Sequence, residues 1–165
     1  MKESQSSIYY IAGETLDAIK DSPFLERFRA KGIEVIFMTD PMDEYAVQNL
    51  AEYDGFRLQS ISKEGLRFGD EGDDEQRRAD EYRRRFEPLA EWLKETLGDK
   101  IEKAVISNRL AETPAVLVTG QYGYSANMER IMRSQAFADP ERAKFMISKK
   151  TMEINPRHPI VATLL

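Results

Sequence analysis

A run of consecutive apolar residues stands near the start of the chain at residues 8–12, and a second run, apolar except for Glu34, stands at residues 33–38. Runs of this length without alternation are typical of strands that are buried on both faces. Each run is followed by a capping residue and a proline, at Ser22 and at Asp40, and this combination predicts the first turn of a helix. The order strand, helix, strand, helix predicts a small α/β unit with parallel strands and right-handed crossovers.

The two helices predicted in this unit carry apolar residues at helical spacing. The first is expected to end at Gly32, because glycine is a common residue just after a helix. The second is expected to continue to Asp54 and Gly55. The apolar stripes comprise Phe24, Leu25 and Phe28 in the first helix, and Tyr45, Ala46, Leu50 and Tyr53 in the second.

An acidic stretch and a long helix occupy the middle of the chain. Residues 70–75 favour a solvated, mobile loop. The helix that follows contains Pro88, where we expect a kink or the start of a new helix. Its arginines lie among acidic residues, which favours a solvated charged face over an anion-binding site. The apolar face comprises Tyr82, Phe86, Leu89 and Leu93, widened by Trp92 and Leu97, and the helix closes at Gly98 and Asp99.

The second half of the chain predicts an α+β arrangement. Residues 101–110 and 115–119 have the pattern of two strands joined by a turn that contains Pro114. A further strand is predicted at residues 151–155, and residues 159–165 have the pattern of a helix that has barely begun. Because a domain does not normally stop inside a helix, we expect the chain to be a piece of a longer protein.

The most informative segment is a loop with glycines and tyrosines that runs into a helix with methionines, residues 120–135. Ser125 is placed to cap this helix, because its hydroxyl can accept from the first free backbone N–H groups. Methionine is flexible and polarisable, so a methionine-bearing surface can repack against different partners. An ordinary core helix has the same spacing, and both interpretations stay open on the pattern alone. The stripe comprises Met128, Ile131, Met132 and Gln135.

Composition narrows the possible classes of protein. The 165 residues are 41% hydrophobic and 32% charged, which is ordinary for a soluble domain. The net charge of −5 disfavours a nucleic-acid-binding face. The absence of cysteine excludes disulfides and thiolate metal sites, and the single histidine, His158, cannot build a histidine metal site alone. No apolar run is long enough to span a bilayer, and we expect no membrane partner. No signal peptide opens the chain, an absence that means little for an internal fragment.

The residues predict no catalytic constellation. The α/β unit at residues 8–55 could hold a nucleotide at its strand ends, and an enzyme or nucleotide-binding module is our alternative hypothesis. The loop around Gly13, after the first strand, lacks a glycine-rich phosphate cradle. In the later glycine-containing loop, the bulky Tyr122 and Tyr124 favour the display of aromatic rings over phosphate binding. His158 stands in a turn-like segment with prolines, which favours a structural role over catalysis.

Long stretches of the chain resemble the ninety-kilodalton heat-shock chaperone family. The segment YGYSANMERIMRSQ, residues 122–135, resembles the signature of the family's C-terminal domain. Five other stretches, four before this segment and one after it, stand in the same order as in the family. Together with this segment they cover nearly the whole chain, which is stronger evidence than a lone short motif. Three stretches resemble the endoplasmic-reticulum members of the family most. They are FRLQSISKEGLRF (residues 56–68), FEPLAEWLK (residues 86–94) and INPRHP (residues 154–159). The five stretches are IYYIAGE, DSPFLERF, DPMDEYAVQNLAEYDG, DKIEKAVISNRL and SKKTMEINPRHPIV.

The resemblance implies a domain organisation. Residues 1–98 would be the end of the middle domain, an α/β unit with a long helix, and residues 99–165 the start of the C-terminal domain, which binds clients and supports dimerisation. Family members are ATPases whose ATP and magnesium lie in an N-terminal domain that this chain does not contain. We therefore expect this chain to bind no cofactor and to catalyse no reaction.

The resemblance also implies partners and a compartment. Client polypeptides and co-chaperones are the expected partners, within a homodimer whose main dimerisation helices would follow residue 165. The endoplasmic-reticulum lumen is the expected compartment, and the cytoplasm is the alternative.

A client-binding surface follows from the same resemblance. In the family, an aromatic and methionine cluster of the C-terminal domain faces the space between protomers and contacts client chains. Tyr124 stands where many members carry tryptophan, and tyrosine keeps an apolar body with a polar tip. A second, short helix is predicted after Asp139, and its shortness and flanking lysines favour exposure of its apolar residues. The matching residues are Tyr124, Met128, Met132, Phe145 and Met146, of which all but Met132 are expected to form one exposed patch.

Overall fold

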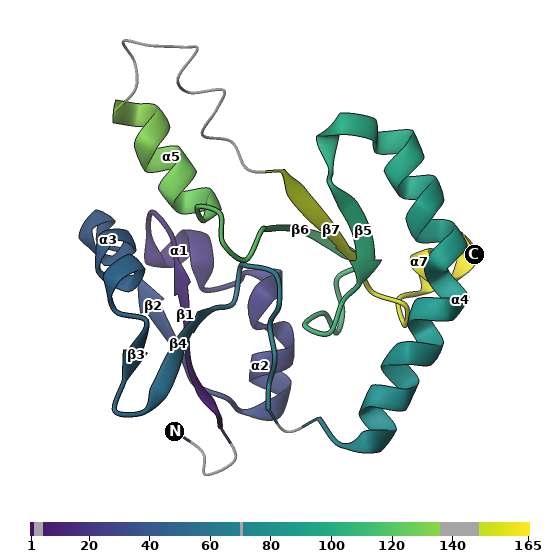
Figure 1. Ribbon diagram of the computed structural model, residues 1–165, viewed down its shortest axis with the longest axis horizontal. Coiled ribbons are helices and arrows are strands. Elements are labelled where there is room, and N and C mark those ends of the chain that lie inside the picture. Colours follow the sequence, from purple (N-terminus) through teal and green to yellow (C-terminus); the bar gives the residue numbers. More distant parts are fainter. Residues whose placement is uncertain (2–4, 70, 136–148) are drawn as a thin grey trace.

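Two mixed β-sheets, each with its own helices, lie side by side in the molecule (Figure 1). The first sheet has the strand order β2-β1-β4-β3 and the second has the order β5-β7-β6. This mixed α/β architecture agrees with the predicted sequence of an α/β unit and an α+β unit, whereas the division into a middle and a C-terminal domain after residue 98 stays a prediction. The computed structural model describes residues 1, 5–69, 71–135 and 149–165 of the 165-residue chain.

The first sheet is built around a central strand, β1 (Ser7–Ala12). β1 pairs in parallel with β2 (Val35–Met38) on one side and with β4 (Phe56–Ser60) on the other. A short strand, β3 (Glu52–Tyr53), adds to β4 in the antiparallel direction. The two parallel strands predicted from apolar runs are confirmed, and β4 is a strand that the apolar pattern did not predict.

The helix starts and stops of this unit follow the local signals in the sequence. The Ser22 hydroxyl accepts from the backbone N–H of Phe24, and Asp40 forms a capping box with Asp43. Gly32 ends its helix with a φ of 61°, a left-handed conformation that glycine adopts without strain. The elements are α1 (Leu16–Ile19), the 3₁₀ turn η1 (Pro23–Leu25), α2 (Glu26–Lys31) and α3 (Pro41–Asn49).

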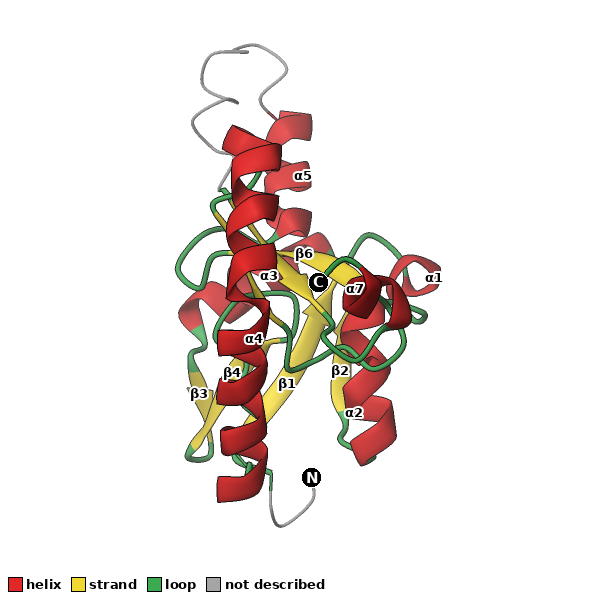
Figure 2. Cartoon of the chain, turned by 90° about the vertical axis from the view of Figure 1, so that its right-hand side faces the viewer, coloured by secondary structure: helices red, strands yellow, loops and turns green. Residues whose placement is uncertain are grey.

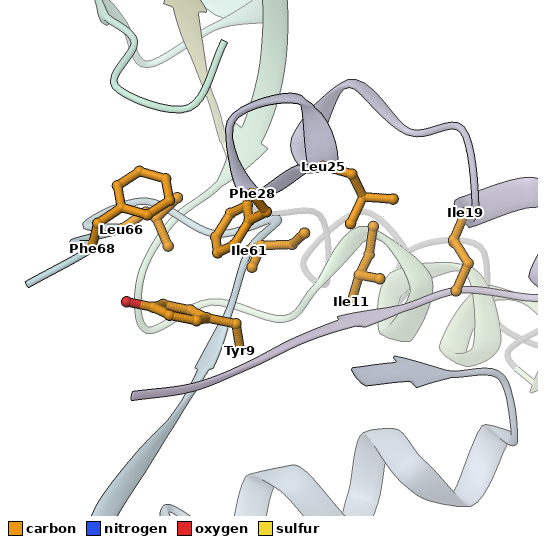
Figure 3. Close-up of a cluster of buried hydrophobic side chains, with 8 residues drawn as sticks. All are labelled: Tyr9, Ile11, Ile19, Leu25, Phe28, Ile61, Leu66 and Phe68. Carbon is orange, nitrogen blue, oxygen red and sulfur yellow. The ribbon is translucent and has the colours of Figure 1, made fainter. Parts of the chain in front are cut away.

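A cluster of apolar side chains fills the space between β1 and the helices α1 and α2 (Figure 3). Tyr9 and Ile11 alternate along β1 and therefore face the same side of the sheet. The Tyr9 ring packs edge-on against Phe28 of α2, with ring centroids 5.0 Å apart, and its hydroxyl donates to the carbonyl of Arg67 at 2.7 Å. The cluster comprises Tyr9, Ile11, Ile19, Leu25, Phe28, Ile61, Leu66 and Phe68.

Two expectations for this unit are wrong. β2 is an edge strand with Ile36 and Phe37 exposed, so it is not buried on both faces. The helix that was expected to reach residue 54 ends earlier, at Asn49. Asp54 and Gly55 both have positive φ values, 51° and 81°, as in the tight turns that favour β-hairpins. This turn places the preceding residues in β3 instead of in the helix.

The second unit is bordered by one long helix, α4 (Asp73–Leu97), seen along its full length in Figure 2. The acidic stretch at residues 73–75 forms its first turn instead of a loop, where negative charge favours a helix. Helical structure continues through Pro88, so no new helix starts there. Pro88 and Arg84 are both exposed, so water can reach the Arg84 carbonyl that loses its helical donor.

Three strands form the second sheet: β5 (Lys103–Ile106), β6 (Ala115–Thr119) and β7 (Lys150–Ile154). All three were predicted approximately, but β5 and β6 are not neighbours as expected of two strands joined by a turn. β7 lies between them, parallel to β5 and antiparallel to β6. The helix α5 (Ala126–Gln135) lies between β6 and β7 in the chain, so it belongs to the connection between these two neighbouring strands.

α4 packs its apolar face on this second sheet and on the last helix, α7 (Pro159–Thr163). Phe86 and Leu89 of α4 are buried against Ile154 and Val161. The pattern predicted that Trp92 widens this face, and this prediction is wrong because the Trp92 side chain is exposed. The predicted start of a helix near residue 159 is confirmed, and His158 caps it by accepting from the Ile160 N–H at 3.2 Å. This contact is the structural role that the sequence favoured for the single histidine.

Candidate functional site

The predicted client-binding segment consists of α5 and the loop before it. Ser125 caps α5 as predicted, because its hydroxyl accepts from the Met128 N–H at 2.9 Å. Tyr124 is 41% exposed, whereas Met128 is only 4% exposed. The expectation that Met128 lies in an exposed patch is therefore wrong, because the face of α5 that carries Met128 and Ile131 turns toward the interior. Met132 is half-buried.

Phe145 and Met146, the other two residues of the expected patch, lie outside the described residues. Tyr122 is a residue that the expected set left out, and its side chain is 95% exposed. It stands between Gly120 and Gly123, whose carbonyl and N–H close a turn at 3.2 Å. The signal was present in the sequence, since a tyrosine in a glycine-flanked turn has no neighbouring side chains to bury it. Client contact by this segment stays a prediction.

A carboxylate from the first unit holds the start of α5. Glu44 of α3 is buried, accepts from the Ser125 hydroxyl at 2.5 Å, and accepts from the Asn127 amide at 3.1 Å. A negative charge at a helix N-terminus is favourable, because the first backbone N–H groups point toward it. The pKa of Tyr10 is raised to about 12, mainly because its side chain is buried and, to a smaller extent, because the negative charge of Glu44 disfavours the phenolate. Tyr122 and Tyr124 thus lie in a loop that leads directly into a helix whose start is bonded to Glu44 of the first unit.

A second link between the two units is made by Arg109, which is held in a buried ion pair of the second unit. Arg109 follows β5 and is 1% exposed, and its guanidinium donates to both carboxylate oxygens of Glu153 on β7, at 2.8 and 2.7 Å. The same guanidinium donates to the backbone carbonyls of Ile61 and Lys63, which follow β4 in the first unit. The Ser107 hydroxyl also donates to Glu153, at 2.8 Å. Arginine suits this place because its planar fork can serve a carboxylate and two carbonyls together.

A third link is made by Glu26 of α2. Its carboxylate accepts from the N–H groups of three consecutive residues of the second unit and from the Thr113 hydroxyl. Partial burial opposes the charged form of Glu26, but these hydrogen bonds outweigh burial and hold its pKa below the ordinary value of 4.5. The three residues are Ala111, Glu112 and Thr113.

These three links give the junction between the units a polar, directional character. A hydrogen bond to a charged group contributes about 1.5–3 kcal/mol, and it is lost steeply when its geometry is disturbed. Links of this kind fix the relative orientation of two units more narrowly than apolar contact does. The arrangement therefore restricts how the two sheets can move relative to each other.

A groove of about 610 Å³ opens between α4, the segment after β4 and the end of β5. Its acidic side chains are engaged within the protein, as in the pair formed by Arg27 and Glu75. Two exposed arginines, Arg67 and Arg157, also line it. The lining is predominantly polar and charged, unlike the mostly apolar lining of typical small-molecule sites.

The geometry does not favour the alternative of a nucleotide site at residues 8–55. The N–H of Gly13 donates to the Met38 carbonyl at 3.0 Å, so it is not free to cradle a phosphate. A Cβ at Gly13 would stand 2.2 Å from the Ile19 side chain, which accounts for the glycine by packing. The next helix, α1, has only four residues. A tight strand-to-helix connection explains this loop without a ligand.

The described residues contain neither a metal-binding cluster nor a membrane-spanning helix. In that part of the chain, no three His, Cys, Asp or Glu side chains gather closely enough to hold a metal ion. Among the same residues, no helix combines the length and the apolar character needed to cross a bilayer.

Comparison with known proteins relates the whole chain to one family. The family profile described as Hsp90 protein matches residues 1–165. The chain is 48% identical over 164 residues to the human protein described as putative heat shock protein HSP 90-beta-3, covering 99% of this chain and 27% of that protein. It is also 48% identical over 169 residues to an endoplasmin homolog of Caenorhabditis elegans, covering 100% of this chain and 22% of that protein. The chain thus spans about a quarter of the length of these relatives. A match that extends from the first residue to the last shows that the chain belongs to the Hsp90 protein family.

Proposed function

We propose that the chain is a client-binding and coupling segment of an ATP-driven molecular chaperone. The observation that carries this proposal is the loop before α5, which exposes Tyr122 and Tyr124 while Glu44 bonds the first turn of that helix. Exposed aromatic rings bind apolar stretches of unfolded chains at low conformational cost. Membership of the Hsp90 family supports a chaperone role.

The second part of the proposal concerns coupling. Arg109, Glu26 and Glu44 each bond across the junction between the two sheets. A rotation of the first unit would therefore displace the start of α5 and the tyrosines before it. In a longer protein with an upstream ATPase, this segment would convert a movement of the first unit into a change at the client surface.

Client binding is tested with the double substitution Tyr122→Ser, Tyr124→Ser. We expect it to weaken binding of reduced, carboxymethylated α-lactalbumin at least about tenfold, because aromatic anchors contribute much of the energy of such contacts. The melting temperature should stay nearly unchanged, since both rings are exposed. Trp92→Ser, an exposed aromatic on α4, is the matched control and should bind like the unchanged chain. Equal binding by both variants would refute the proposal.

We further propose that this chain neither binds ATP and magnesium nor hydrolyses ATP, and that both activities belong to an upstream domain of the full-length protein. Two observations support this proposal: the Gly13 N–H already donates to the Met38 carbonyl, and α1 has only four residues. A nucleotide-dependent rise in melting temperature of the chain, or ATP hydrolysis above background that a substitution in residues 8–55 abolishes, would overturn it.

The partners and compartment of the longer protein form the last part of the proposal. We propose a homodimer that binds client polypeptides and co-chaperones, without a nucleic-acid or membrane partner. Sedimentation of this chain beside a version extended at its C-terminus tests whether following residues are needed for the dimer. The resemblance of residues 56–68 to endoplasmic-reticulum members leads us to propose the lumen as the compartment, with the cytoplasm as the alternative. Fractionation of cells expressing the full-length protein distinguishes them.

A further inference from the structure

α3 is an amphipathic helix whose apolar side faces outward. Successive residues of a helix are rotated by about 100°, so Met42 and Tyr45 share one side of α3 and Glu44 lies on the opposite side. Leu50 follows directly after the last helical residue. The three apolar side chains are exposed, whereas the Glu44 carboxylate is buried against the start of α5. The usual arrangement is the reverse, with apolar residues inward and charges outward.

Exposed apolar side chains also occur in the hairpin that follows α3. Tyr53 of β3 and Phe56 of β4 are directly paired across the hairpin, so their side chains lie on the same face of the sheet. Both are exposed, with Tyr53 at 66%, and Met42 at the start of α3 is 67% exposed. Five large apolar side chains are thus exposed within fifteen positions of the chain. The outer surface of α3 comprises Met42, Tyr45, Leu50, Tyr53 and Phe56.

Acidic residues predominate in this region, although the exposed Arg57 pairs directly with Glu52 across the hairpin. Residues 32–56 contain no lysine or arginine, whereas the next basic residues on either side are Lys31 and Arg57. Such a field repels the phosphates of nucleic acids and of anionic lipids, and it attracts cationic segments. The acidic residues are Glu34, Asp40, Asp43, Glu44, Glu52 and Asp54, and all except Glu44 and the half-buried Asp43 are exposed.

We propose that the outer surface of α3 is a docking site for a basic amphipathic segment of a partner protein, separate from the tyrosines that would contact clients. Its apolar residues receive the apolar face of the segment, and the acidic residues around them pair with its lysines and arginines. Glu44 has a second role in this arrangement. Because its carboxylate bonds to Ser125 on the inner side of α3, a segment bound on the outer side is connected through one helix to the start of α5.

The test uses a fluorescein-labelled peptide of eighteen residues, with leucines at i, i+3, i+4 and i+7 spacing and lysines at the other positions. Fluorescence anisotropy gives its Kd for the whole chain. The substitution pair Met42→Ser, Tyr53→Ser should raise the Kd at least about tenfold, as expected when two anchors of a contact are removed. The pair Glu52→Lys, Asp54→Asn should also raise it, and asparagine tolerates the positive φ at position 54. The control pair Leu16→Ser, Trp92→Ser changes exposed apolar residues elsewhere and should alter the Kd less than twofold.

Four results would overturn the proposal. A scrambled peptide of equal charge that binds as tightly would show that charge alone attracts the peptide, and a glutamate version that binds as tightly would show that charge does not matter. An unchanged Kd for the Met42→Ser, Tyr53→Ser pair would place the peptide elsewhere. A dimer of the unchanged chain that the same pair dissociates in sedimentation would show that a second copy covers this surface. Thermal unfolding at an unchanged temperature confirms that each variant is folded.

Discussion

Replacing Glu153 with alanine removes the acidic member of the buried ion pair and leaves the guanidinium of Arg109 in place. Two charge-assisted hydrogen bonds between these side chains are lost, together with the bond from the Ser107 hydroxyl. The guanidinium keeps its backbone acceptors at Ile61 and Lys63. Its charge then lies in the interior without a counter-ion, because Arg109 is almost completely buried.

The expected loss of stability follows from these contacts. Removing one partner of a buried ion pair costs about 3–5 kcal/mol, most of which is the penalty of the charge that remains. A change of 1 kcal/mol shifts the melting temperature of a chain of this size by about 2–4 °C. Glu153→Ala should therefore lower the melting temperature by roughly 6–20 °C. Glu102→Ala, an exposed carboxylate just before β5, is the matched control and should shift it by less than about 2 °C.

Thermal and urea unfolding measure the loss, and hydrogen exchange places it in the structure. The Glu64 amide donates to the Thr119 carbonyl at 2.9 Å and so joins the two units beside the ion pair. In Glu153→Ala this amide should exchange at least about tenfold faster, whereas amides of β1 should change less. In a double-mutant cycle with Arg109→Met, the two substitutions together should cost less than the sum of the single effects. A loss below about 1 kcal/mol for Glu153→Ala, or additive effects in the cycle, would refute the conclusion that Arg109 depends on Glu153 as its buried counter-ion.

Three further predictions concern other contacts of the junction and the first unit. The pKa of Glu26 is lowered by folding, so its contribution to stability is present above pH 4.5 and declines as the pH falls through the lower folded value. Urea titrations should show that the advantage of the unchanged chain over Glu26→Gln shrinks as the pH is lowered below 4.5, and a constant difference would contradict this. Ser125→Ala should cost about 1–2 kcal/mol in urea unfolding, because it removes the cap of α5 and a hydrogen bond of Glu44, and Ser125→Thr should recover part of it. Gly13→Ala should lower the melting temperature by several degrees, because the new Cβ would stand 2.2 Å from the Ile19 side chain; an unchanged melting temperature would show that this side chain moves aside freely.

Local signals in the sequence predicted most of the secondary structure. Proline after a capping residue at Ser22 and Asp40, and glycine after α2, act through bonds within a few residues of one another. Their outcome therefore does not depend on the rest of the fold. The turn at Asp54 and Gly55 carries an equally local signal, an Asp-Gly pair, and this signal prevails over the helical spacing of the residues before it.

The burial of individual apolar residues could not be predicted in the same way. Tyr45 and Leu50 have the spacing of a core-facing stripe and are exposed, whereas Met128 was expected at the surface and is buried. Spacing specifies which residues share a side of a helix, but not which side the rest of the protein covers. That choice depends on where the neighbouring elements lie.

The amino-acid sequence by itself determined the starts and stops of helices, two parallel strands, the capping role of Ser125 and the family to which the chain belongs. The tertiary structure alone decided that β7 separates β5 from β6, that Arg109 pairs with Glu153, and that Glu44 reaches the start of α5. The members of these last two pairs are 44 and 81 residues apart. Contacts between such distant residues depend on the path of the whole chain, and a local pattern contains no information about that path.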